Sequence, residues 1–181
     1  MAKPSRVVVL VEDERHRQFV RRYLYRLNYL LHDIRFEPLP NGRGCGEQWV
    51  REKYANAVAA YRARQARAET ALVVAIDSDR GDLNRRMQQL QEALTEKGLP
   101  PREAGERIAH FIPRRNIETW VLCLNGRAVD EETDYRREPL AAEEISSAAQ
   151  VFYAWTRPQA RPPQHCVPSL FTAIPEAQRL E

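Results

Sequence analysis

The chain has 181 residues, of which 43% are hydrophobic and 29% are charged, and its formal net charge at pH 7 is +3. This length suits a single domain with its own core, and no stretch approaches the ~18 apolar residues that a membrane span requires. The early apolar run turns acidic too soon for a signal peptide, so we expect a cytoplasmic protein without membrane contact.

Two further compositional features bound the function. The three cysteines are widely spaced and form no C-x-x-C pair, so neither a disulfide framework nor a zinc ribbon is indicated. Lysine occurs only at positions 3, 53 and 97, so arginine carries most of the positive charge. Arginine binds phosphate bidentately, which is compatible with nucleic acid binding, although a GC-rich genome would produce the same bias.

The chain begins with a strand and a helix. Residues 6–11, RVVVLV, predict a buried strand, which ends in three acids of which Glu12 is the first. Apolar residues recur every three or four positions over residues 14–31 and predict a helix. Arg15 and Arg22 lie on one side of it, either as a solvated face or as a path for a phosphate backbone. His16 lies on the same helix, and a surface position is the better interpretation for it.

The next elements are a short strand, a glycine-rich loop and a second helix. Residues 34–39 alternate weakly and predict a strand. The loop that follows, PNGRGCG at 40–46, lacks the phosphate-loop and dinucleotide-binding patterns. It therefore indicates a turn and only weakly a phosphate-binding loop. Residues 47–69 predict a helix with cations in its last turns.

The run ALVVAIDSD at residues 71–79 is the most informative stretch of the sequence. It predicts a buried parallel strand that ends at Asp77 and Asp79, and the carboxyl ends of such strands are where ligands bind. Each acid alone could be a helix cap or turn residue. Together with Glu12 at another strand end, they indicate a site for Mg²⁺, which prefers carboxylate oxygens.

The remaining pattern completes an α/β fold. Residues 82–97 predict a helix, 107–112 a strand, and 117–124 a short helix that begins beside Arg114 and Arg115. A polar loop at 127–140 precedes helices at 141–155 and 168–180. The order of elements predicts a mostly parallel four-strand central sheet with helices on both faces. We expect an α/β core over residues 1–126 and a helical extension over 127–181 that packs on the same domain.

With Glu12 closing the first strand and Asp77-Ser78-Asp79 closing the third, the chain resembles the Toprim family, whose fold serves topoisomerases, bacterial primases and overcoming-lysogenization-defect nucleases. Residues 112–122, IPRRNIETWVL, look like the arginine-rich element of small standalone Toprim-like proteins that are often encoded beside an ATPase. The resemblance covers roughly residues 6–124 and implies a Toprim/Rossmann-like fold. The family usually has glycine after its first glutamate; Asp13 stands there in this chain and either adds a fourth acid or caps the helix.

The resemblance implies Mg²⁺- or Mn²⁺-dependent phosphodiester hydrolysis of DNA or RNA. Glu12 would be the general base or a metal ligand. The acids that would hold the metal are Glu12, Asp77 and Asp79, supported by Asp82 and Glu118. Asp82 could instead simply cap its helix. Arg114 and Arg115 would clamp the scissile phosphate, a role that preorganised cations can fill. The resemblance also implies an ATPase partner and a role in anti-phage defence.

Three alternatives stay open at this point. The same fold could be a non-catalytic binding module that docks on an ATPase or on nucleic acid, with its acids acting as caps. A phosphoacceptor receiver domain needs a lysine after its last strand, where this chain has none. A small-molecule phosphatase or phosphotransferase could use the same metal pocket.

Overall fold

A four-strand parallel sheet forms the centre of the protein. The computed structural model describes residues 4–39, 46–78, 82–163 and 166–181. The order of the strands across the sheet is β2-β1-β3-β4, and each neighbouring pair is parallel. The strands are β1 (Arg6–Val11), β2 (Ile34–Phe36), β3 (Thr70–Ala75) and β4 (Ile108–Phe111).

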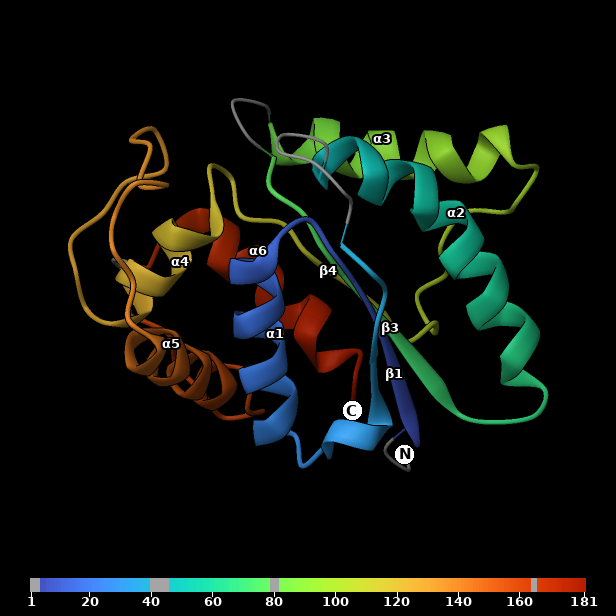
Figure 1. The fold of residues 1–181 in the computed structure, drawn as a ribbon, viewed down its shortest axis with the longest axis horizontal. Helices are drawn as coiled ribbons and strands as arrows, with labels where there is room; N and C mark the ends of the chain where they lie inside the picture. Colours follow the sequence, from blue (N-terminus) through green and yellow to red (C-terminus); the bar gives the residue numbers. More distant parts are fainter. Residues whose placement is uncertain (1–3, 40–45, 79–81, 164–165) are drawn as a thin grey trace.

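Helices cover both faces of this sheet, as Figure 1 shows. One face carries α2 (Gly46–Gln65) and α3 (Leu83–Glu96). The other face carries α1 (Glu14–Arg26), α4 (Ile117–Leu124), α5 (Ala142–Trp155) and α6 (Pro168–Gln178). The predicted α/β fold with a parallel central sheet and helices on both faces is therefore confirmed.

β1, β3 and β4 each contribute to two separate apolar cores because successive side chains point to opposite faces of a sheet. In β1, Val7 and Val9 face the core with α1, whereas Leu10 faces the core with α2. Every residue of β3 is buried. Its sequence is therefore a continuous apolar run instead of an alternating one, as expected for a strand covered on both sides.

The structure shortens several predicted elements. The first helix ends at Arg26 because Asn28 adopts a positive φ of 62°, and a 3-10 turn, η1 (Leu31–Asp33), leads into β2. Cys123 and Cys166 are both buried thiols. Within the described ranges, none of the helices combines the length and apolar character needed to cross a membrane.

The connections of β1 and β3 diverge beyond the carboxyl ends of these two strands. β1 continues through α1 to β2 on one side, and β3 continues through α3 to β4 on the other side. The two helices lie on opposite faces of the sheet (Figure 1). In open α/β sheets, ligands bind outside the carboxyl ends of two strands whose connections diverge in this way.

Candidate functional site

Glu12 and Asp77 meet at the carboxyl ends of β1 and β3. The strands pair in register up to Val11 and Ala75, and the Glu12 N–H donates to the Ala75 carbonyl at 3.1 Å. Two residues beyond Ala75, the Asp77 N–H donates to Glu12 Oε2 at 3.0 Å. The parallel register therefore brings together two acids that are separated by 65 positions in the chain.

His16 bridges Asp13 and Asp77. Asp13 is the N-cap of α1 and accepts a hydrogen bond from the His16 N–H at 2.9 Å. The imidazole Nδ1 lies 2.9 Å from Asp13 Oδ1, and Nε2 lies 3.0 Å from Asp77 Oδ1. Asp13 thus caps the helix, one of the two roles expected for it, and also contacts the histidine. The surface position predicted for His16 is wrong: its exposed fraction is 0%, because the first turn of α1 lies over the strand ends.

Charges determine the protonation of this cluster. Burial alone would lower the pKa of His16, but the carboxylates of Asp77 and Asp13 outweigh it and raise that pKa well above its usual range. Burial opposes ionisation of Asp13, yet His16 holds the pKa of that carboxyl below its usual range. Burial raises the pKa of Asp77, and His16 opposes this rise. At neutral pH the cluster therefore has an imidazolium between two acids.

Arg136 reaches the same aspartate from the loop between α4 and α5. Its Nη2 lies 3.6 Å from Asp77 Oδ2, so the Asp77 carboxylate has a cation near each oxygen. Sequence reasoning placed this arginine in an exposed polar loop and gave it no role. Neither the spacing nor the periodicity of the sequence signals a contact between Asp77 and an arginine 59 positions further along the chain.

Glu118 and Arg15 form an ion pair beside this cluster. Glu118 is buried in the first turn of α4, and its charge helps to raise the pKa of Asp77. Arg15 also donates to the carbonyls of Arg136 at 2.8 Å and Glu138 at 3.4 Å. Arg15, which was expected to contact phosphate, here holds Glu118 and the loop.

The other predicted residues lie on the segments that follow β3 and β4. The Ser78 hydroxyl donates to the carbonyl of Arg114, which ties the end of β3 to the segment that carries both candidate phosphate clamps. Asp82 is the N-cap of α3 and accepts from the Asn84 N–H at 3.1 Å. Asp82 and Arg114 both line a groove of about 450 Å³. Arg114 and Arg115 face the acidic loop that also contains Arg136.

Two of the side chains at these strand ends are of the chemical type that binds a hard divalent cation. Glu12 and Asp77 supply carboxylate oxygens, the ligands that Mg²⁺ prefers. Asp79, the third predicted ligand, lies outside the described residues. Among the residues that the structure describes, no group of three or more His, Cys, Asp or Glu side chains is arranged to hold a metal ion. Glu12 and Asp77 are the described residues that would hold one.

Gly46 packs directly on Glu12 at the start of α2. A Cβ atom at this position would collide with the Glu12 carbonyl oxygen and would lie 2.6 Å from its Cγ. Glycine is therefore needed for the close approach of the helix to the strand end. The glycine-rich sequence indicates a turn here but gives no sign of the contact with Glu12.

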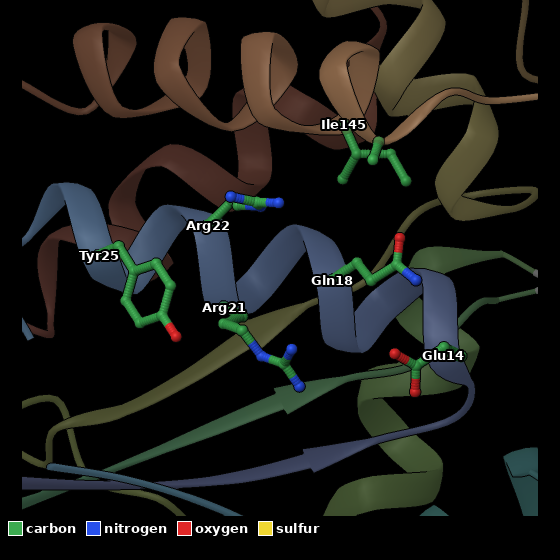
Figure 2. A pocket seen from close by; sticks show the side chains of 7 residues that line it. Glu14, Gln18, Arg21, Arg22, Tyr25 and Ile145 are labelled. Carbon is green, nitrogen blue, oxygen red and sulfur yellow. The ribbon is translucent and has the colours of Figure 1, made fainter. Parts of the chain in front are cut away.

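A second groove lies between α1 and α5, as Figure 2 shows. It has a volume of about 410 Å³. It is lined by Glu14, Gln18, Arg21, Arg22, Tyr25, Ala142 and Ile145. Arg22, which was expected to bind substrate, therefore lies in a groove that begins one residue beyond Asp13, whereas Arg26 from the next turn donates to Gln150 on α5 at 3.0 Å.

The chain was compared with protein-family models, with curated proteins and with solved structures, and none of the three comparisons found a match.

Proposed function

We propose that this chain is a divalent-metal-dependent phosphodiester hydrolase that acts on nucleic acid. The observation that carries this proposal is the meeting of Glu12 and Asp77 at the point where the connections of β1 and β3 diverge. A glutamate and an aspartate from two such strand ends are the pair that the resemblance to Toprim proteins predicts. Asp79 completes the proposed ligand set from the sequence alone.

The residues of the chain would divide the work as follows. Glu12 and Asp77 would hold Mg²⁺ or Mn²⁺, which when bound polarises a phosphate and lowers the pKa of an attacking water. His16 balances the buried charge of Asp77 and fixes one carboxylate oxygen in place. Arg114 and Arg115 would stabilise the negative charge that develops on the phosphate.

The groove between α1 and α5 favours a polymer over a small phosphate ester. From Glu14 to Tyr25 it follows twelve residues of helix, which span about 16 Å at the rise of an α-helix. Arg22 offers a guanidinium group for a backbone phosphate, and the 37% exposed Tyr25 ring offers a surface on which a base can stack. Arg21 also lines the groove, but its guanidinium lies over the Phe36 ring at 5.2 Å. The groove begins beside the Asp13–His16–Asp77 cluster, so one strand could reach both.

A non-catalytic binding module is the second candidate. It is favoured by the two cations beside Asp77, because His16 and Arg136 already compensate its charge as a structural cluster would. In that case Glu12 and Asp77 would stabilise the junction between the carboxyl ends of β1 and β3, and the arginines would bind nucleic acid or a partner. An ATPase partner and a role in anti-phage defence rest on the resemblance alone.

Cleavage assays on plasmid DNA and on total tRNA, with Mg²⁺ or Mn²⁺, separate the two candidates. Wild type is compared with Asp77→Asn and with a control, Glu96→Gln, which removes an exposed carboxylate from the far end of α3. We expect wild type and the control to cleave, and chelator or Asp77→Asn to abolish cleavage. Binding of nucleic acid without cleavage by any of the three proteins would favour the binding module.

A further inference from the structure

An acidic segment of the loop between α4 and α5 lies across the candidate site. We call residues 130–138 the strap. At its start Glu131 is buried, and its Oε1 accepts a hydrogen bond from the N–H of Ser169 at 2.9 Å. Beyond this anchor the residues from Glu132 to Arg137 are mostly exposed. The strap therefore has one buried acidic anchor, and most of its remaining residues lie on the surface.

The acids of the strap contact the two arginines that the proposed function assigns to the scissile phosphate. Glu132 Oε1 lies 2.7 Å from Arg114 Nη2, and Asp134 Oδ2 lies 4.0 Å from Arg115 Nη2. The other oxygen of Asp134 accepts from Asn116 Nδ2 at 3.0 Å. Carboxylates and phosphates use the same geometry on a guanidinium group.

The cation of the strap occupies the acidic side of the same site. Arg136 Nη2 lies 3.6 Å from Asp77 Oδ2. The Arg136 carbonyl accepts a hydrogen bond from Arg15, which holds this part of the strap against α1. One segment of nine residues thus places anions on the proposed phosphate clamps and a cation on the proposed metal ligand.

We propose that the strap is an internal substrate mimic that closes the site until a polyanion displaces it. Glu132 and Asp134 hold the positions of two phosphates on Arg114 and Arg115, and Arg136 holds Asp77 in place of an external cation. This proposal rests on the proposed function, since it takes the displacing polyanion to be a nucleic acid strand. Its own content is the competition between the strap and that strand.

The exposure of these contacts explains how the strap can be displaced. The Glu132 side chain is 77% exposed and Arg114 is 46% exposed, so their ion pair is screened by water and contributes little. A strand with several phosphates can replace both acidic contacts at once, and it releases counterions when it does so. Strap closure is therefore weak enough to yield to a polymer.

Binding of a short fluorescent oligothymidine, measured by anisotropy in chelator, tests this competition without any hydrolysis. The variant Glu132→Gln with Asp134→Asn removes both acidic contacts. The matched control, Glu92→Gln with Glu96→Gln, removes the same charge from an exposed face of α3. We expect the strap variant to bind about fivefold more tightly than the control. Equal affinities of the strap variant and the control would overturn the proposal, as would a failure of the strap variant to bind at all.

Hydrogen exchange of wild type provides a second measurement that depends on no variant. The N–H of Arg136 donates to Asp134 Oδ1 at 3.0 Å, and the N–H of Glu138 donates to the Tyr135 carbonyl at 2.9 Å. Added oligothymidine should accelerate exchange of both amides. Unchanged or slower exchange with bound oligothymidine would overturn the proposal.

These readouts separate the strap from the hydrolysis. Tighter binding by the strap variant without Mg²⁺-dependent cleavage by wild type would sustain the strap and remove the proposed hydrolysis. The opposite result is cleavage by wild type that depends on Asp77, with equal binding by the strap variant and its control. That result would support the proposed hydrolysis and overturn the strap. Should Asp134→Asn impair folding through Asn116, Glu132→Gln alone gives the same test against Glu96→Gln.

Discussion

His16 is charged, fully buried and in contact with two acids, a combination that makes it sensitive to substitution. His16→Gln removes the imidazolium and leaves the buried Asp77 charge compensated only in part by Arg136. We expect a loss of about 3–5 kcal/mol in the free energy of unfolding, measured by urea denaturation. His32→Gln, at an exposed position, should change it by less than about 0.5 kcal/mol.

The double variant His16→Gln with Asp77→Asn checks the cause of this loss. Removing the second charge should restore much of the stability, because no uncompensated carboxylate remains buried. If the double variant is less stable than His16→Gln alone, the charge of Asp77 is not the source of the loss.

His110 should make folding sensitive to acid. It is buried in β4 with Nε2 at 3.0 Å from the Tyr54 hydroxyl, and burial, with the nearby charge of Arg102, lowers its pKa to about 3. In the unfolded chain this histidine has a pKa of ~6.5. Below that pH the unfolded state therefore binds more protons than the folded state. Its contribution to stability is complete above about pH 6.5 and is lost as pH falls toward about 3, by ~1.4 kcal/mol per pH unit.

The measurement for His110 compares urea denaturation at about pH 7.5 and about pH 5. Wild type should lose about 2 kcal/mol from this residue over that interval, and His110→Gln should lose correspondingly less. Parallel losses in both proteins would show that His110 does not remain neutral in the fold.

At the scale of the element, α1 joins the candidate site to the groove that we propose for the substrate. Its first turn holds His16, and Arg21 and Arg22 of its later turns line the groove. In Figure 2 Arg22 points toward α5, whereas Arg21 points away from it. The same helix packs on α5, which forms the opposite wall. A change on its groove face can therefore alter binding without reaching the apolar core.

Arg21→Gln combined with Arg22→Gln should weaken the binding of single-stranded nucleic acid. Each phosphate contact that is lost should lower the slope of log K against log salt by about 0.7 for a single strand. Fluorescence anisotropy at several salt concentrations measures this slope. The control is Arg64→Gln with Arg67→Gln at the far end of α2; an equal change in slope there would indicate an effect of net charge alone.

At the scale of the whole molecule, the C-terminal helices complete one of the two cores. The Phe152 ring of α5 packs on Tyr23 of α1 with centroids 5.1 Å apart, and on Phe111 of β4 at 5.6 Å. Trp120 of α4 donates to the Ser169 hydroxyl at 2.6 Å. Residues on both sides of position 126 thus share a continuous apolar interior.

A fragment of residues 1–126 should therefore not fold by itself. It would expose one side of the aromatic cluster around Tyr23 and Trp120, and this apolar surface contributes a large part of the hydrophobic stabilisation. Circular dichroism and urea denaturation of the fragment check this expectation. A cooperative transition with native helix content would show that residues 127–181 are dispensable for the core.

The order of the elements, the parallel sheet and the meeting of Glu12 with Asp77 were determined by the sequence itself. Hydrophobic runs specify buried strands, and parallel strands place their carboxyl ends at one edge, so an acid after each run must arrive there. The sequence also predicted the cap at Asp82 as an alternative to a metal ligand, and the structure has that cap.

The burial of His16, the pairing of Arg15 with Glu118 and the reach of Arg136 to Asp77 were decided only by the tertiary structure. Periodicity tells which face of a helix is apolar, but it does not tell which distant loop covers a polar position on that helix. Arg136 lies 59 positions beyond Asp77, in a segment without regular structure, so no local pattern constrains their contact. Packing of the loop against the strand ends converts an apparently solvated histidine and arginine into partners of the central aspartate.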